Sequence, residues 1–407
     1  MLLVSFAGLS LLWRTPRLRG ARAGYVLPDP LSRLLDARAP LAVARAVSLL
    51  GAGAVVVLAL LGPARLTQNP APYAFYVTFW VGLVPASLLL GGVWRALNPL
   101  RTLSAGLARL AGEPYAAGAL PRLGLWPATG FLLAFAWVEL VLPDRSVPHT
   151  LGLLLLGYAV VSLLAAVWFG PEWFASGDVF EVWSTLLGRL SPLGRRDDGR
   201  WVLRSPLDGA DATPPAPGLA AFALTSIGTT AFDGLSRSTW WTATVAPGGR
   251  ALLVPSAALA GCVLLAAGLY ALGTAYAGRV AGLPRPAAVF AHSVVPIAAG
   301  YAVAHYFSLL VFEGQRTLIL ASNPLALPGV DLLGVYGNAI DYSVVSTRTI
   351  AAVQVVGVVL GHVLGVILSH DRAVRLAGSA SLARRSQYGL LAVMVVLTVS
   401  ALRLLLG

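Results

Sequence analysis

Two apolar stretches near the C-terminus decide the fold: residues 287–312, AAVFAHSVVPIAAGYAVAHYFSLLVF, and residues 347–369, TRTIAAVQVVGVVLGHVLGVILS. Each is long enough to cross a bilayer as one helix, which takes about 20 mostly apolar residues. The two stretches nevertheless contain three of the chain's five histidines, and a fourth follows directly. Because an ionisable side chain is costly near the centre of a bilayer, they predict a membrane protein with a polar interior.

The composition of the whole chain agrees with a membrane location. Of its 407 residues, 57% are hydrophobic and 11% are charged, whereas about 25% of an average soluble protein is charged. We predict an all-α fold, a polytopic transmembrane helical bundle that forms one domain over residues 1–407. The first apolar run is short and its charges follow it, so we expect the native chain to begin upstream. Apolar runs predict about ten spans, at 1–13, 41–62, 73–94, 124–142, 150–169, 218–240, 251–277, 287–312, 347–369 and 386–406.

The arginines predict the orientation of these spans. The chain contains no lysine, so all 29 of its basic residues are Arg. Basic residues favour the cytoplasmic side of a membrane. We therefore predict that both termini face outward, and that the net charge of +12 forms a cytoplasmic rim against anionic lipid rather than a nucleic-acid site. Of the arginines, seven lie in one set of connections and 21 in the alternate set, at 14–40, 95–123, 170–217, 278–286 and 370–385.

Two connections are long enough to have structure of their own. In the cytoplasmic segment 170–217, residues 178–190 form a broad apolar face and predict a helix in the plane of the membrane interface. Asp198 and Gly199 predict a hairpin turn, and a proline-rich linker follows it. On the outer side, the connection 313–346 carries several polar side chains, and we expect a loop that can act as a lid.

The composition excludes several kinds of chemistry. Without lysine, the chain has no P-loop lysine, no Schiff base and no Ser–Lys dyad. Cys262 is the single cysteine and lies within a predicted span, so no disulfide and no thiolate metal cluster is possible within the chain. The common short motifs of serine hydrolases, zinc proteases, nucleotide-binding proteins and EF-hands do not occur in the sequence.

Histidines toward the cytoplasmic ends of two spans suggest a metal site. His292, His362 and His370 lie at similar depth, and Asp371 follows the last of them. We predict that His292 and His362 approach one another and that all four residues are candidate ligands for a divalent metal such as zinc. The alternative for His370 and Asp371 is compensation of charge at the end of a helix.

The span that contains His362 also has a packing seam. Gly357, Gly361 and Gly365 follow the small-xxx-small spacing that lets another helix approach closely. Gln354 and His362 lie along the edge of this seam. We interpret them either as hydrogen-bonding contacts between helices or as part of a ligand or proton site.

A second polar set falls in the outward half of the predicted bundle. Asp233 and Arg237 are spaced i, i+4 and can pair, while Glu139 and His305 come from two other spans. We expect Asp233, His305 and Glu139 to line a polar cavity reached from outside and to be the candidate catalytic residues. The alternatives are a helix end satisfied by its own ion pair and a glutamate that extends to the membrane surface.

Other polar residues within or beside the spans complete the candidate set. Tyr301 and Tyr306 lie near His305 on the same predicted helix. Asp178 and Glu181 have the spacing of a capping box at the start of a helix, which is the alternative to a role at the site.

Four segments of the chain resemble a group of bacterial membrane proteins commonly called fenitrothion hydrolases. The resemblance covers most of residues 1–375, and relatives begin upstream with a complete first span. It implies a multi-pass protein of the bacterial cytoplasmic membrane that hydrolyses organophosphorus triesters, and it transfers no catalytic residue. The segments are FGPEWFASGDVFEVWSTLLGRLSPLGRR (169–196), TTAFDGLSRSTWW (229–241), FAHSVVPIAAGYAVAHYFSLLVFEGQR (290–316) and GHVLGVILSHDRAV (361–374).

Two functions fit these features. In the first, imidazoles and carboxylates bind a divalent metal, lower the pKa of its water and present hydroxide to an apolar phosphotriester that enters from the lipid. In the second, the same residues pass protons or metal ions across the membrane in a transporter, and no bond is broken. Hydrolysis in detergent supports the first function, and movement into sealed vesicles supports the second.

Overall fold

The computed structural model describes residues 2–245 and 252–406, which are mostly helical with very little strand, so the predicted all-α bundle is confirmed. Three strands form one small sheet, and short 3-10 and π segments lie between the α-helices. The strands are β1 (Tyr25–Val26), β2 (Leu193–Arg195) and β3 (Trp201–Leu203). The helices are α1 (Leu2–Leu12), α2 (Asp29–Leu35), α3 (Arg38–Leu61), α4 (Ala71–Tyr73), α5 (Leu83–Leu90), α6 (Val93–Leu97), α7 (Pro99–Ala111), α8 (Leu120–Leu123), α9 (Trp126–Leu140), α10 (Pro148–Phe169), α11 (Trp173–Gly177), α12 (Val179–Arg189), α13 (Pro206–Asp211), α14 (Leu219–Ser236), α15 (Leu253–Ala281), α16 (Pro286–Phe290), α17 (Val295–Ala321), α18 (Thr347–Leu376), α19 (Ala380–Ser386) and α20 (Tyr388–Leu406).

Seven helical segments in the described residues are long and apolar enough to cross a membrane. A pair bent by 70°, formed by α8 with α9, brings the number to eight. Two other predicted spans, α1 and α14, form helices but are not among these candidates. α1 has only 11 residues, and α14 contains several hydroxyl groups and an aspartate. The structure thus supports a multi-pass membrane protein, while ten spans stay a prediction. The seven segments are Asp29–Leu61, Ala71–Leu90, Pro148–Phe169, Leu253–Ala281, Pro286–Ala321, Thr347–Leu376 and Ala380–Leu404.

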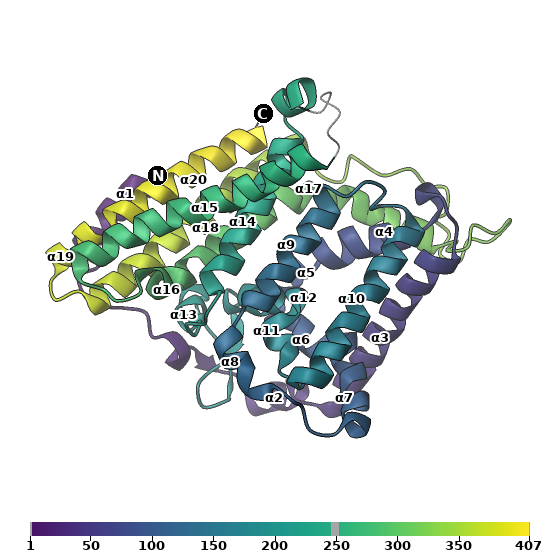
Figure 1. Ribbon diagram of the computed structural model, residues 1–407, viewed down its shortest axis with the longest axis horizontal. Coiled ribbons are helices and arrows are strands. Elements are labelled where there is room, and N and C mark those ends of the chain that lie inside the picture. Colours follow the sequence, from purple (N-terminus) through teal and green to yellow (C-terminus); the bar gives the residue numbers. More distant parts are fainter. Residues whose placement is uncertain (1, 246–251, 407) are drawn as a thin grey trace.

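The helices form two groups with α12 between them (Figure 1). One group contains α3 and α10, which pack against each other, and the other contains α14, α15, α17, α18 and α20, with α9 packed against α14. Nine of the eleven residues of α12 are buried, including Trp183 and Leu187. The prediction of an interface helix over 178–190 is therefore wrong. The same apolar face is covered by other helices of the bundle, notably α5, α9 and α17.

Polar contacts hold this central helix at its first turn. Asp178 caps α12 by accepting a hydrogen bond from the Glu181 amide at 2.7 Å, as the capping spacing predicts. The Glu181 carboxylate accepts two hydrogen bonds from Arg101, with N–O distances of 3.1 and 2.6 Å. Asn98 Nδ2 lies 3.2 Å from Asp178 and 3.3 Å from Glu181. These contacts assign both acids to the packing of α12.

The predicted glycine seam joins α18 to the start of α17. A Cβ atom on Gly361 would lie 2.6 Å from the carbonyl oxygen of Pro296. A Cβ atom on Gly365 would lie 2.8 Å from the carbonyl oxygen of Ser293. Larger residues here would push the helices apart, so the seam sets the relative depth of the two helices that carry the intramembrane histidines.

Contacts between distant segments gather at one end of the bundle, at the lower left of Figure 1. β3 pairs with β1 on one side and, around a turn at Gly199 (φ +80°), with β2 on the other, which confirms the predicted hairpin. Asp211 of α13 binds Arg372 and Arg375 of α18 at 3.1 and 3.2 Å. All these segments belong to the Arg-rich connections. They lie at one end of the bundle, as expected if Arg-rich and Arg-poor connections alternate between the two ends. The side of the membrane that this end faces stays a prediction.

α17 is longer than the sequence predicts. It continues to Ala321, so the outer loop begins at residue 322 rather than at residue 313. Glu313 and Arg316 pair at 3.0 Å on the surface of this extension, which favours a helix for the polar stretch. Gln315 then anchors the loop, because its side chain makes hydrogen bonds of 3.0 and 2.9 Å with the main chain of Asp341.

Candidate functional site

Asp233 is the centre of a network in the half of the bundle away from the Arg-rich end, the half that the sequence predicts to face outward. It lies on α14 and is 2% exposed. Its Oδ2 atom lies 2.8 Å from Nε2 of His305 on α17. Its Oδ1 atom accepts a hydrogen bond of 2.8 Å from Nε of Arg237, one turn further along α14. Three residues that the sequence placed at similar depth are therefore in direct contact.

His305 and Arg237 line an open cleft of ≈ 470 Å³, which we call the outer cleft. In the described residues no hydrogen bond reaches His305 Nδ1, so this ring nitrogen has no protein partner there. The side chain of Arg237 is 65% exposed, which leaves its terminal nitrogen atoms free to contact another molecule. The outer cleft is thus bordered by an imidazole that is oriented by a carboxylate and by a guanidinium group.

Aromatic and charged side chains complete the wall of the outer cleft. Phe312 of α17 and Tyr342 of the outer loop lie with ring centres 5.0 Å apart. Glu313 and Arg403 add one charge of each sign. Gln354, a predicted candidate, also lines this cleft rather than the seam alone. Because Tyr342 follows the anchored Asp341, the outer loop covers part of the cleft, and its closure as a lid stays a prediction.

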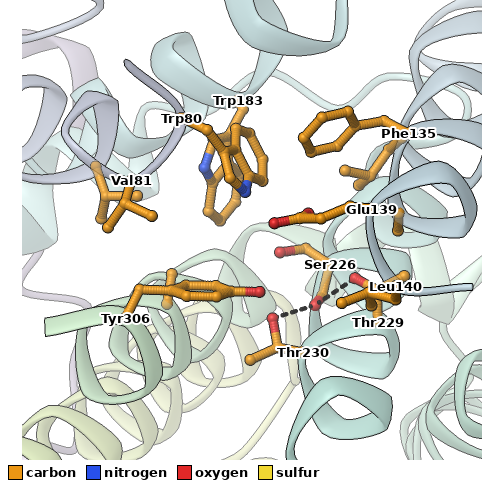
Figure 2. Close-up of a pocket in the computed structure, with 14 residues that line it drawn as sticks. Trp80, Val81, Phe135, Glu139, Leu140, Trp183, Ser226, Thr229, Thr230 and Tyr306 are labelled. Atoms are coloured by element: carbon orange, nitrogen blue, oxygen red, sulfur yellow. Dashed lines mark hydrogen bonds between the residues drawn. The ribbon is translucent and has the colours of Figure 1, made fainter. Parts of the chain in front are cut away.

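Glu139 does not join this network but lies in a separate closed cavity beside it. Figure 2 shows its carboxyl group and the Tyr306 hydroxyl directed into the same space. Tyr306 also lines the outer cleft, so its ring separates the two spaces. The cavity offers ≈ 20 Å³ to the centre of a water molecule, which is room for about one water. The sequence therefore placed Glu139 at the right depth but in the neighbouring cavity.

The closed cavity has an unusual number of polar groups for the interior of a membrane bundle. The indole Nε1 atoms of Trp80 and Trp183 are buried and find no hydrogen-bond partner in the described residues. Thr229 and Thr230 donate their hydroxyl hydrogens to the Ser226 carbonyl oxygen, at 3.1 and 2.9 Å (Figure 2). Their oxygen lone pairs can therefore accept hydrogen bonds from a guest in the cavity.

The predicted metal ligands are held by other protein groups. Nδ1 of His370 lies 3.2 Å from Gln387 Oε1, and its Nε2 lies 3.0 Å from the carbonyl oxygen of Trp13. Asp371 receives hydrogen bonds from Trp13 Nε1 at 2.8 Å and from the Arg17 amide at 2.7 Å, and it pairs with Arg375. These two residues thus attach the segment after α1 to α18, and their role as metal ligands stays a prediction.

The other two predicted ligands, His292 and His362, are both buried, and their approach to one another stays a prediction. His362 is fully buried and its Nδ1 lies 2.8 Å from the Val358 carbonyl oxygen of its own helix. His292 lies in the 3-10 turn before α17. In each ring Nε2 is buried without a partner in the described residues. No group of three His, Cys, Asp or Glu residues in this part of the chain is arranged to hold a metal ion. The metal stays a prediction.

The structure also adds residues that the sequence did not point to. Trp80, Trp183 and Arg403 line the cavities, although they are ordinary residues of apolar helices or of a helix end in the sequence. Only the cost of leaving an indole N–H unpaired in a span could have drawn attention to the two tryptophans. Tyr301, by contrast, was a candidate and packs with Val358 in a small apolar cluster away from both cavities.

No known protein family, curated protein or solved structure matches the chain. We therefore base the function on the geometry of the outer cleft and the closed cavity.

Proposed function

We propose that this protein is a multi-pass membrane hydrolase whose active site is the outer cleft. The observation that carries the proposal is the contact of 2.8 Å between Asp233 and His305 at the wall of this cleft. A buried carboxylate that accepts the Nε2–H of an imidazole leaves Nδ1 as a proton acceptor, which is the arrangement of a general base. Support for the alternative of a mere helix-end ion pair is weaker, since the pair also engages a histidine from another helix.

The proposed reaction is attack of water on a neutral phosphotriester. His305 Nδ1 accepts a proton as the water oxygen bonds to phosphorus, and the bond from phosphorus to the leaving oxygen breaks. The same proton then passes to the leaving oxygen, so the products are a phosphodiester acid and an alcohol or phenol. Arg237 can donate its terminal N–H groups to the phosphoryl oxygen, where negative charge develops. No step uses a metal ion.

The substrate class follows from the resemblance and from the shape of the cleft. A volume of ≈ 470 Å³ lies within the usual range for small-molecule sites, about 300–1,000 Å³. Aromatic rings at its edge suit an aryl ester that has partitioned into the lipid. Under the proposed topology, with ten spans and both termini outside the bacterial cytoplasmic membrane, the cleft faces the periplasm.

Hydrolysis by purified protein tests this proposal. The wild type in detergent is incubated with a neutral phosphotriester that releases nitrophenol, and the absorbance is followed. We expect His305→Gln to lower kcat by about 100-fold or more, as expected for loss of a general base. His149→Gln is the matched control, because His149 is exposed and lies outside both cavities. Equal rates for wild type and His305→Gln, or no turnover at all, would contradict the proposal.

A transporter is the second candidate, because three cavities follow one another along α14. A cavity of ≈ 570 Å³, the end vestibule, reaches Leu219 at the Arg-rich end. The closed cavity reaches Ser226 and Thr230, and the outer cleft reaches Gly234 and Arg237. At a rise of about 1.5 Å per residue, this stretch of α14 is roughly 27 Å long, close to the thickness of a bilayer core.

Proton movement into sealed vesicles tests the second candidate. A pH-sensitive dye inside the vesicles reports protons that enter under an imposed pH gradient. If the cavities form a proton path, Glu139→Gln abolishes the flux, whereas the exposed Glu113→Gln leaves it unchanged. Turnover in detergent without flux in vesicles supports the hydrolase, and flux without turnover supports the transporter.

A further inference from the structure

The end vestibule has features of a binding site that the proposed hydrolysis does not use. Its volume of ≈ 570 Å³ is larger than that of the outer cleft. The prolines of its wall come from three connections and from the start of α8, and proline fixes the backbone around it. They are Pro114, Pro121, Pro171, Pro214, Pro215 and Pro217.

Two arginines face this vestibule without an acidic partner. Arg95 and Arg189 both line it, and neither makes an ion pair or a side-chain hydrogen bond in residues 2–245 and 252–406. The pKa of Arg189 is lowered by burial and, to a smaller extent, by the charge of Arg95. The vestibule also contains Glu172, which lies too far from both for an ion pair. The two cations therefore repel each other with little compensation from the protein.

Other arginines at the same end of the bundle do have acidic partners. Arg101 is paired with Glu181, and Arg372 with Asp211. Arg189 lies in the last turn of α12, where a cation also favours the helix dipole. That contribution does not explain Arg95, which lies on the separate helix α6 and points its charge into the same space.

An unsatisfied hydroxyl group lies in the same wall. Thr213 is 6% exposed, and its Oγ1 atom is buried without a hydrogen-bond partner in the described residues. Thr213 lines the vestibule together with Thr185. A buried hydroxyl normally has a partner, so the packing of this wall is incomplete around Thr213. The two unpaired guanidinium groups of the same vestibule favour a ligand that accepts hydrogen bonds and carries negative charge.

We propose that the end vestibule binds a phosphate group through Arg95 and Arg189. Guanidinium groups match the geometry of phosphate oxygens and remain charged when partly buried. The phosphate belongs either to the headgroup of an anionic lipid or to a small soluble compound. Two exposed aromatic residues beside the vestibule, Tyr115 and Trp168, have ring centres 5.2 Å apart, and such pairs are typical of the headgroup level of a membrane.

Lipid and phosphate binding to the intact, delipidated protein test this site. The first arm measures retention of phosphatidylglycerol against phosphatidylcholine by native mass spectrometry. The second arm measures the thermal unfolding temperature with and without inorganic phosphate. We expect Arg95→Gln with Arg189→Gln to weaken the response about tenfold or more, as expected for charge-assisted hydrogen bonds. A response confined to the first arm identifies a lipid headgroup, and a response to phosphate alone identifies a soluble ligand.

The matched control removes the same charge from the same end. Arg384→Gln with Arg385→Gln replaces two exposed arginines outside the vestibule and should bind as the wild type does. If the Arg95 and Arg189 double variant fails to fold, Arg95→Gln alone is used, since Arg95 is exposed, and a partial loss is expected. Binding that is the same in wild type and vestibule variants, or that falls equally in the control, overturns the proposal. None of these outcomes depends on hydrolysis.

Discussion

Two acidic centres of this protein share a sequence pattern and differ in their surroundings. Asp371 pairs with Arg375 at 2.7 Å, and Asp233 pairs with Arg237 at 2.8 Å, in both cases one helical turn apart. Both aspartate side chains are almost completely buried. The spacing and the bond are the same, so neither separates a structural ion pair from a functional one.

The difference lies in the contacts beyond the ion pair. Asp371 also accepts hydrogen bonds from the Trp13 indole and from the amides of Arg17 and Leu18, and Arg375 also pairs with Asp211, so these contacts all stay within the protein. Asp233 instead contacts His305, whose ring lines the outer cleft. A buried carboxylate stabilises the fold when all its contacts end within the protein. It becomes a candidate for chemistry when one contact ends at a cavity.

The largest effect is expected on the free energy of unfolding when Asp371 is replaced. Asp371→Ala removes the ion pair and three hydrogen bonds while leaving their donors in place. The loss of one partner of a buried pair costs about 3–5 kcal/mol, but Arg375 is 36% exposed and keeps its contact with Asp211, so we expect the lower end of this range, about 3 kcal/mol. Thermal unfolding in detergent, followed by tryptophan fluorescence, measures this. Hydrolysis per folded molecule should stay unchanged, and a variant as stable as the wild type would remove the contrast.

The second effect is expected on hydrolysis when Asp233, beside the outer cleft, is replaced. Asp233→Asn keeps the shape of the side chain but no longer holds the His305 imidazole with a charged acceptor. We expect kcat to fall about 100-fold, which corresponds to ~2.7 kcal/mol in activation free energy. The unfolding temperature should fall less than in Asp371→Ala. The comparison would fail if the two variants lost stability equally while Asp233→Asn kept its turnover.

The smallest effect concerns Asp178, an acid that is equally buried but has no arginine in contact. Burial raises the pKa of Asp178 from 3.8 to about 6. The folded state therefore favours the neutral acid, and its contribution to stability is lost as the pH rises from about 4 through 6. Asp178→Asn, which can still cap α12, should remove this loss, so the variant should lose less stability than the wild type between pH 4 and pH 8. Unfolding temperatures at both pH values measure the difference. A variant with the same pH dependence as the wild type would place the titrating group elsewhere.

Depth and local spacing were sufficient to predict the outer network. Asp233 and Arg237 are neighbours on one helix, and His305 falls at the same depth on another, so periodicity alone brought them close. Asp371 has one local partner, Arg375, but Trp13 and Arg17 are 358 and 354 positions away, and no local pattern indicates them. The prediction of α12 as an interface helix failed for a related reason. An apolar helix face has the same sequence pattern whether lipid or other helices cover it. Glu139 shows the limit of depth, which places a residue at a level but not in a particular cavity.

The attachment of the segment after α1 to the end of α18 has a consequence for biosynthesis. Trp13 leaves the ribosome 358 positions before Asp371. At roughly 5–20 residues per second, that interval is on the order of 20–70 s. During this time Trp13 and the amides after it lack their final acceptor. The segment after α1 and the end of α18 must therefore meet after the helices between them are in place, so a chain that stops before residue 371 lacks this attachment.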